Sequence, residues 1–260
     1  MLACQVAGDT AAPLLFLAHG VTDSASSLAD AISRLSTSWH VVAIDSLGHG
    51  ASPRFTDEDL DRPMEAALDA LRQTVTHYAD RYGPGFGLGH SMGGALLSRL
   101  AYESPNLLRG IILEDPAWLT GLQAAEYRRH AATAADLGAR DDQSVLAGLR
   151  NDYPDWPASE LAPWLQAKHE ADERFRQLGT VGYIEPWNRW LADLVVPTAV
   201  LTSDQSDCII GPDGIARIEA ARNPLIETVM IPGLRHVMRR DNPELFHEAV
   251  DSLLSRWKDA

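Results

Sequence analysis

The sequence predicts an α/β fold, a mostly parallel sheet of about seven strands flanked by helices, with one helical insertion. Short and nearly continuous apolar runs recur along the chain, which is typical of strands that are buried on both faces. Segments with helical periodicity lie between these runs, so helices are expected on both faces of the sheet. The alternation stops between residues 117 and 189, and this break predicts the insertion.

Six apolar runs are the expected strands. Each holds about five apolar residues and ends in small or polar residues. They span residues 13–20, 40–46, 85–91, 109–116, 197–204 and 226–233. Only about a dozen residues precede the first run, so we expect one edge strand to be missing or rudimentary.

Three segments between the strands have the pattern of amphipathic helices. Residues 64–82 place Met64, Leu68 and Leu71 on one helix face, and residues 26–36 repeat this spacing. Residues 241–257 open with a polar cap and a proline in the first turn, and then continue with helical periodicity.

The segment from 117 to 189 is predicted to contain several short helices and no strand. Two proline- and glycine-containing stretches interrupt it, and most of the tryptophans of the chain lie in it or directly after it: Trp118, Trp156, Trp164, Trp187 and Trp190. We therefore divide the chain into a core formed by residues 1–116 and 190–260 and an insertion formed by residues 117–189.

The composition restricts the classes of partner. The formal net charge of −14 argues against nucleic acid and anionic membranes. Cys4 and Cys208 form neither a disulfide framework nor a metal-ligand spacing, which fits a reducing compartment. No apolar run approaches the roughly 18 residues of a membrane-spanning helix. We expect a cytoplasmic monomer or homodimer that acts on a small molecule and uses no metal or cofactor.

The stretch GLGHSMGG, residues 87–94, joins a predicted strand to a predicted helix. It fits the G-x-S-x-G pattern, in which a strained turn lifts a serine hydroxyl above the sheet. Side chains at Gly89 and Gly93 would collide in such a turn. The helix that follows would favour negative charge developing near Ser91. A helix-capping serine is the alternative, but it would need neither glycine.

A serine nucleophile needs a base, and His236 is the candidate. It follows the last predicted strand and precedes the last helix, which is the position of the base in the chain order serine, acid, histidine. A surface histidine is the alternative interpretation. His19, His49 and His90 lie in motif loops, where we expect them to fix the backbone.

The acid that orients the histidine has several candidates. Asp204 lies at the end of the strand expected at 197–204, and Asp207 lies a few residues further along the loop. We prefer Asp207 because its carboxylate can reach the histidine more easily. Glu114 and Asp115, which lie one strand earlier, form the alternative pair. A helix cap or a solvated loop charge is the other interpretation of each of these residues.

An oxyanion hole requires two N–H donors. We expect one from Met92, which follows the candidate nucleophile. The loop after the first strand supplies the other, and Val21 is preferred to Thr22.

Five segments together resemble the ordered landmarks of the α/β-hydrolase superfamily. They are HGVTDS (19–24), DSLGHGASP (45–53), GHSMGG (89–94), TSDQSD (202–207) and GLRHV (233–237). The resemblance covers essentially the whole chain. It implies that Ser91 is the nucleophile, His236 the base and Asp207 the acid, and that residues 117–189 form a helical cap. It also implies a structural role for residues 45–53.

The chain departs from the family pattern in two respects, and its serine excludes some enzyme classes of this fold. Ser203 stands where such proteins often carry a glycine, which leaves the register of the acid open, and the first strand of the family is absent from the expected elements. Epoxide hydrolases and haloalkane dehalogenases of this fold need a carboxylate nucleophile, so Ser91 excludes them. Hydroxynitrile lyases and cofactor-free haloperoxidases share the serine and stay open.

We therefore expect a serine hydrolase that cleaves a carboxylic ester or lactone of a small, largely apolar substrate through an acyl-serine intermediate. Trp118 is the candidate pocket residue because it leaves the sheet close to the acid, with core packing as the alternative. A C–C bond hydrolase or an acyltransferase would use the same triad. A small-molecule receptor without catalysis is the third interpretation.

Overall fold

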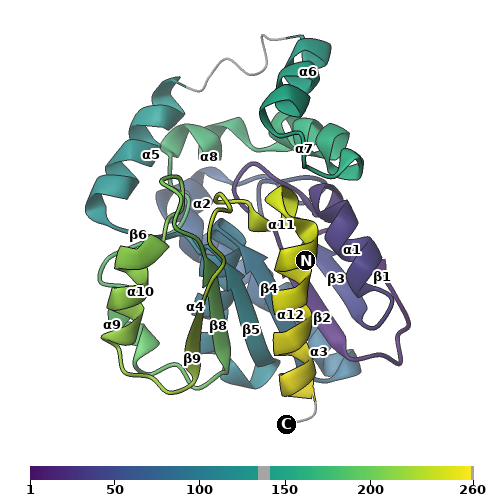
Figure 1. Cartoon of the computed structure of the whole chain (residues 1–260), viewed down its shortest axis with the longest axis vertical. Coiled ribbons are helices and arrows are strands. Elements are labelled where there is room, and N and C mark those ends of the chain that lie inside the picture. Colours follow the sequence, from purple (N-terminus) through teal and green to yellow (C-terminus); the bar gives the residue numbers. More distant parts are fainter. Residues whose placement is uncertain (134–140, 259–260) are drawn as a thin grey trace.

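A computed structural model describes residues 1–133 and 141–258 of the chain and contains the predicted sheet. Seven strands lie in the order β1-β3-β2-β4-β5-β8-β9 (Figure 1). Their bounds are Cys4–Ala7 (β1), Leu14–Ala18 (β2), His40–Ile44 (β3), Gly85–His90 (β4), Leu108–Glu114 (β5), Thr198–Thr202 (β8) and Ile226–Met230 (β9). Strand β1 is the short edge strand, and it pairs antiparallel with β3, whereas the other pairs are parallel. The α/β fold predicted from the sequence is confirmed.

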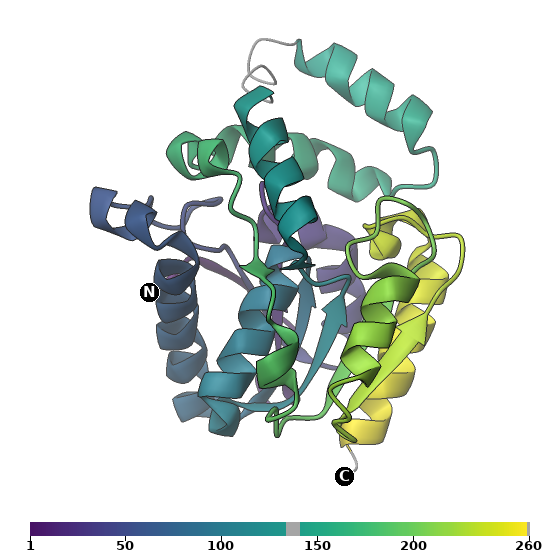
Figure 2. The ribbon, with the colours of Figure 1, turned by 90° about the vertical axis from the view of Figure 1, so that its left-hand side faces the viewer.

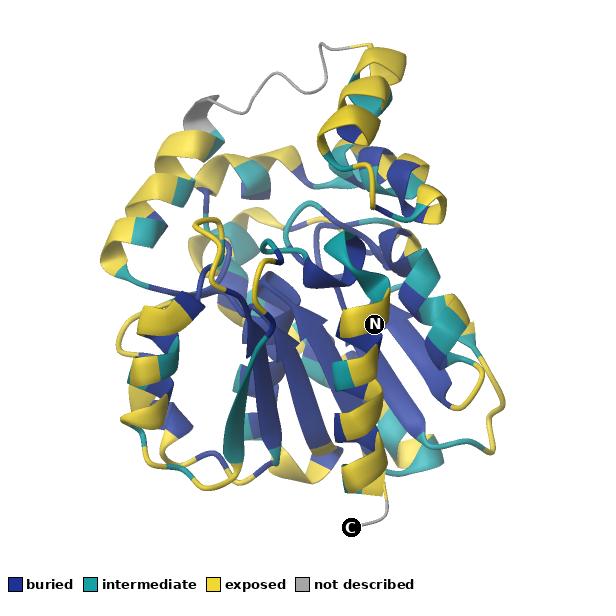
Figure 3. Cartoon of the chain, viewed as in Figure 1, coloured by how far each residue is buried: buried dark blue, intermediate teal, exposed yellow. Residues whose placement is uncertain are grey.

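Central strands are apolar throughout because they face a helix layer on each side. Along β2, Leu14 and Phe16 pack into one hydrophobic cluster, and the alternate residues Leu15 and Leu17 pack into another. Successive strand side chains point to opposite faces, so both faces must be apolar when both are covered. Figure 3 shows the strands as the buried centre of the molecule.

Helices α3, α4 and α10 supply the first cluster, and helices α1 and α12 supply the second. The bounds are Ala29–Leu35 (α1), Asp57–Asp61 (α2), Pro63–Tyr82 (α3), Met92–Glu103 (α4), Asn188–Leu191 (α9), Gly211–Glu219 (α10), Met238–Asp241 (α11) and Pro243–Lys258 (α12), with 3-10 turns η1 (Ala25–Leu28) and η2 (Pro105–Leu107). The helices expected at 26–36, 64–82 and 241–257 correspond to η1 with α1, to α3 and to α12.

Across residues 1–133 and 141–258, no helix is long and apolar enough to cross a membrane.

Within residues 121–133 and 141–178, four helices cover the carboxyl ends of the parallel strands (Figure 1). They are α5 (Gly121–Thr133), α6 (Asp142–Asp152), α7 (Ala158–Glu170) and α8 (Glu173–Leu178). Figure 2 shows the same teal and green helices above the sheet and its flanking helices.

The prediction that residues 117–189 contain no strand is wrong in one detail. Strand β6 (Trp118–Leu119) pairs in parallel with β7 (Tyr183–Ile184), and the amide of Tyr183 donates to the carbonyl of Ala117 at 3.0 Å. Two residues are too few to produce a recognisable period in a sequence. This pairing joins the beginning of the segment to its end.

Asp172 and Phe175 hold the segment 117–189 against the core. The amide of Asp172 donates to the carbonyl of Gly48 at 2.7 Å, and its carboxylate accepts from the amide of Phe55 at 3.1 Å. The rings of Phe55 and Phe175 stack with their centroids 4.7 Å apart. The loop at residues 45–56 therefore supports α8.

Gly182 lies where β7 crosses the beginning of the segment, and a Cβ there would be 2.0 Å from the carbonyl oxygen of Ala117. We expect Gly182→Ala to lower the free energy of unfolding by about 1–3 kcal/mol, because the backbone must move apart. Gly148→Ala in α6 is the matched control, since its Cβ would meet no atom within 4 Å. The control should stabilise the helix by about 0.5–1 kcal/mol. Urea denaturation measures both, and equal stabilities would contradict the close approach.

Candidate active site

Ser91 lies in a strained turn between β4 and α4, as the sequence predicts. Its backbone has φ 50° and ψ −115°, a conformation that non-glycine residues rarely adopt. The Ser91 amide donates to the carbonyl of Glu114 at 2.9 Å, and its carbonyl accepts from the amides of Ala95 and Ala117, each at 2.9 Å. These bonds to β5, α4 and the following loop hold the strained turn in place.

Three glycines permit the close packing around this turn. A Cβ on Gly89 would lie 2.7 Å from the carbonyl oxygen of Gly93, and a Cβ on Gly93 would lie 2.3 Å from that of Ala18. A Cβ on Gly20 would lie 2.6 Å from Nδ1 of His90. The loop after β2 can therefore approach the Ser91 turn only because these positions lack side chains.

His236 lies between β9 and α11, and its ring is paired with Asp115. The distance from Nδ1 of His236 to Oδ2 of Asp115 is 2.5 Å. The Asp115 side chain is fully buried, whereas 19% of the His236 side chain is exposed. Because the carboxylate of Asp115 accepts the Nδ1–H of His236, Nε2 is the ring nitrogen that can take a proton.

Further donors fix the carboxylate of Asp115. Oδ1 accepts from Oγ1 of Thr202 at 2.8 Å and from the amide of Ile210 at 3.0 Å, and Oδ2 accepts from the amide of Ile209 at 2.7 Å. The backbone of Asp115 has a positive φ of 41°. A carboxylate with this many donors is held in one orientation toward His236.

The expectation that Asp207 pairs with the imidazole is wrong. Oδ2 of Asp207 accepts instead from the backbone amide of His236 at 3.3 Å, and Asp207 is exposed. Asp204 is also exposed, and it accepts from the amide of Gly233 at 2.8 Å. The ring partner is Asp115, one of the alternatives that the sequence left open.

The physical reason is the order of the strands. Strand β5 lies directly beside β4, so the residues that follow them, Asp115 and Ser91, are neighbours at the edge of the sheet. The amide of Asp115 also donates to the carbonyl of Leu201 on β8 at 2.8 Å. An aspartate that directly follows a buried strand and precedes Pro116 was the signal available in the sequence. The sequence does not show which strands are adjacent. The preference for Asp207 therefore depended on its position along the loop alone.

Opposing effects act on the pKa of His236. Burial lowers this pKa, but the hydrogen bond to Asp115 and the negative charges of Asp115, Glu114 and Asp207 raise it, and the net direction is upward from 6.5. The ring is therefore protonated in mildly acidic solution, and it becomes a base above this raised pKa.

Two of the other histidines fix backbone segments, as expected. Nδ1 of His19 bonds to the carbonyl of Gly20 at 2.7 Å, and its Nε2 accepts from the amide of Ser46 at 3.0 Å. Nε2 of His90 lies 3.2 Å from the carbonyl oxygen of His236. Burial lowers the pKa of both His19 and His90, so both rings are neutral.

The loop after β2 is a turn in which the amide of Asp23 donates to the carbonyl of Gly20 at 3.1 Å. The amide of Thr22 donates to Nε2 of His49 at 3.2 Å and is therefore occupied. The amides of Val21 and Met92 donate to no acceptor within the described parts of the chain. The preference for Val21 over Thr22 as an oxyanion donor agrees with this arrangement.

A group of buried charges, which the sequence analysis missed, lies beside these residues. Glu114 accepts from Arg239 at 2.9 Å (backbone amide) and 3.0 Å (guanidinium). Arg240 bonds to Asp23 at 3.1 Å and to Glu160 of α7 at 2.6 Å. Glu114 is therefore paired with Arg239, and among the described residues the hydrogen-bond partner of the His236 ring is Asp115. Two consecutive arginines shortly after His236 were the only signal in the sequence.

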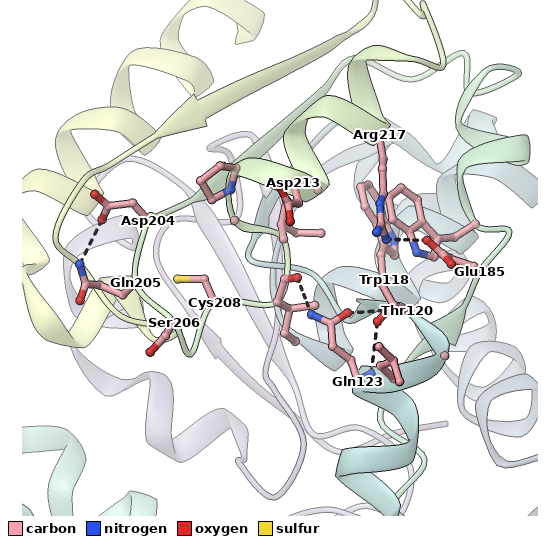
Figure 4. Close-up of a pocket in the computed structure, with 18 residues that line it drawn as sticks. Trp118, Thr120, Gln123, Glu185, Asp204, Gln205, Ser206, Cys208, Asp213 and Arg217 are labelled. Atoms are coloured by element: carbon pink, nitrogen blue, oxygen red, sulfur yellow. Dashed lines mark hydrogen bonds and ion pairs between the residues drawn. The ribbon is translucent and has the colours of Figure 1, made fainter.

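A groove of about 850 Å³ lies between the first turns of α5 and α10 and the loop 204–210, without contribution from Ser91 or His236 (Figure 4). Trp118 lines this groove but is only 1% exposed, and its Nε1 donates to Oγ of Ser98 at 3.1 Å. The stacking of Trp118 on Trp187, with centroids 5.4 Å apart, indicates core packing.

A second cavity of about 360 Å³ lies between α5 and the loop that carries Asp207. No group of three or more side chains suited to a metal ion occurs in the described part of the chain.

The pairing of His236 with Asp115 can be tested by titrating His236 with NMR in three proteins. The pKa should lie above 6.5 in the wild type and fall by about one to three units in Asp115→Asn, because the adjacent negative charge is lost. Asp207→Asn is the control and should lower the pKa less than Asp115→Asn does, because the charge of Asp207 contributes less to raising it. A larger fall in Asp207→Asn than in Asp115→Asn would contradict the geometry. Circular dichroism checks that both variants are folded.

Comparisons with known proteins agree with this fold. The chain is 23% identical over 252 residues to a 2-(acetamidomethylene)succinate hydrolase from Mesorhizobium japonicum, covering 93% of this chain and 88% of that protein. It is 31% identical over 174 residues to a pimeloyl-[acyl-carrier protein] methyl ester esterase from Neisseria meningitidis, covering 66% and 58%. The crystal structure of an E-2-(acetamidomethylene)succinate hydrolase superposes with a TM-score of 0.79 at 19% identity, covering 98% and 95%. The model of the alpha/beta hydrolase family matches residues 14–249, and the chain belongs to this family.

Proposed function

We propose that the protein is a serine hydrolase that cleaves a carboxylic ester or lactone of a small, largely apolar substrate through an acyl-serine intermediate. One observation carries this proposal: a buried carboxylate, Asp115, orients the imidazole of His236 at the edge of the sheet where the strained Ser91 begins α4. A carboxylate–imidazole pair beside a serine is the arrangement that activates a hydroxyl group for acyl transfer.

In the proposed reaction, Nε2 of His236 takes the proton of the Ser91 hydroxyl as Oγ attacks the substrate carbonyl. Asp115 keeps the other ring proton on Nδ1 and stabilises the imidazolium. The amides of Val21 and Met92 donate to the oxyanion of the tetrahedral intermediate. The C–O bond then breaks as His236 protonates the leaving alkoxide. Water attacks the acyl-serine with the same histidine as base, and the acid and free Ser91 are released.

The names of the relatives support hydrolysis in general and ester cleavage in particular. The two enzymes compared above are named a hydrolase and a methyl ester esterase, so hydrolysis is the shared chemistry and ester cleavage has a precedent in one relative. Residues 117–189 are proposed to form a cap over the site, because helices α5 to α8 lie above the carboxyl ends of the strands (Figure 1). The net charge of −14 favours small substrates over nucleic acids as partners.

Hydrolysis of a panel of p-nitrophenyl esters and aryl lactones tests the proposal. The wild type should turn over at least one member, with kcat/KM rising as the pH passes the raised pKa of His236, because only the neutral ring is a base. Ser91→Ala should abolish turnover. Asp115→Asn should lower kcat by about 10³–10⁴-fold, because the imidazole loses its orienting partner.

Asp207→Asn is the matched control, since among the described residues Asp207 bonds to the backbone amide of His236 and to no side chain. Its kcat should stay within about threefold of the wild type. A Ser91→Ala protein that keeps full activity would refute the acyl-serine mechanism. Equal losses in the two aspartate variants would refute the assignment of Asp115.

A further inference from the structure

We propose that Lys168, on helix α7, is a positioning residue for the oxyanion hole, because its ammonium group holds the turn Gly20–Asp23 that carries the Val21 amide. This inference rests on the proposed function. It differs from the roles assigned above because Lys168 acts through the turn and contributes no group to the reacting atoms.

The contact is direct. Nζ of Lys168 donates to the carbonyl oxygen of Thr22 at 2.8 Å and lies 3.8 Å from Oδ1 of Asp23. The Thr22 amide donates to Nε2 of His49 at 3.2 Å, so both peptide groups of Thr22 have fixed partners. The residue next to Val21 is thus held from one side by the core and from the other by α7.

The turn needs such support because Thr22 is strained. Its φ is 58°, in the region that favours glycine and is unfavourable for a β-branched residue. Such a conformation persists only where neighbouring groups over-determine it. If the contact with Lys168 is lost, we expect the turn to relax and the Val21 amide to change direction.

Lys168 is well suited to hold this carbonyl. Its side chain is 13% exposed, and its ammonium lies 4.5 Å from the ring centroid of Trp164. Burial lowers the pKa of Lys168 to about 8, opposed by the charge of Asp23 and assisted by Arg240 and Arg239. Few water molecules compete for a donor in this environment, so the bond to Thr22 is stronger than at the surface.

The helix that carries Lys168 is itself anchored to the core. Glu160, on the first turns of α7, accepts from Nε of Arg240 at 2.6 Å and from the amide of Asp30 at 3.2 Å. Glu160 is buried, and so is Arg240. The position of Nζ relative to the turn is therefore set by rigid contacts along α7.

The test compares Lys168→Met and Arg174→Met on p-nitrophenyl acetate, whose acetyl group is small enough to leave any direct contact of larger substrates with Lys168 out of the measurement. Arg174→Met is the matched control, because Arg174 joins the same segment to Asp57 at 2.7 Å without touching the turn. In Lys168→Met we expect kcat to fall at least tenfold with KM within about threefold, since oxyanion donors act in the transition state. Arg174→Met should keep at least half of the wild-type kcat.

Inhibition by trifluoroacetophenone supplies a second readout, because its adduct with a serine carries an oxyanion. Its Ki should rise in Lys168→Met by the same factor as kcat falls. A wild-type kcat in Lys168→Met, an equal loss in Arg174→Met, or an unchanged Ki would each overturn the inference and leave the proposed hydrolase standing. A wild type that hydrolyses no ester in the panel would refute the proposed function itself.

Discussion

Two buried arginines hold together the segments from which the candidate site is built. Arg239 joins the end of β5, at Glu114, to the loop after β2, at Asp23, and Arg240 joins Asp23 to Glu160 of α7. Removing one partner of such a buried pair typically costs about 3–5 kcal/mol, because the other charge is left uncompensated. The segments that carry the acid, the base, the oxyanion donor and the covering helices are thus forced into one arrangement.

This arrangement supports backbone strain at three points of the site. Thr22, Ser91 and Asp115 all have positive φ angles, and they follow β2, β4 and β5, which are adjacent in the sheet. Each strained residue of this kind costs about 1–3 kcal/mol, which the surrounding contacts must offset. Strain that gathers on three neighbouring strand ends is a property of the site, since the only other positive φ of a described non-glycine residue is at Arg222.

The sequence predicted those parts of the site that depend on local pattern. Ser91 and its flanking glycines form a motif within a few residues, and the strained turn is present. The choice of Asp207 failed because it depended on the order of strands across the sheet, which places Asp115 beside the nucleophile turn. Lys168 is 146 residues from Thr22 in the chain, so no local pattern could link them.

The most direct test of the central claim, that Asp115 and His236 activate Ser91, is reaction with a fluorophosphonate followed by mass spectrometry of the peptides. The account predicts a single adduct on the peptide that contains Ser91, formed much more slowly in Asp115→Asn than in the wild type. A folded wild type that acquires no adduct, or one labelled at another residue, would contradict it.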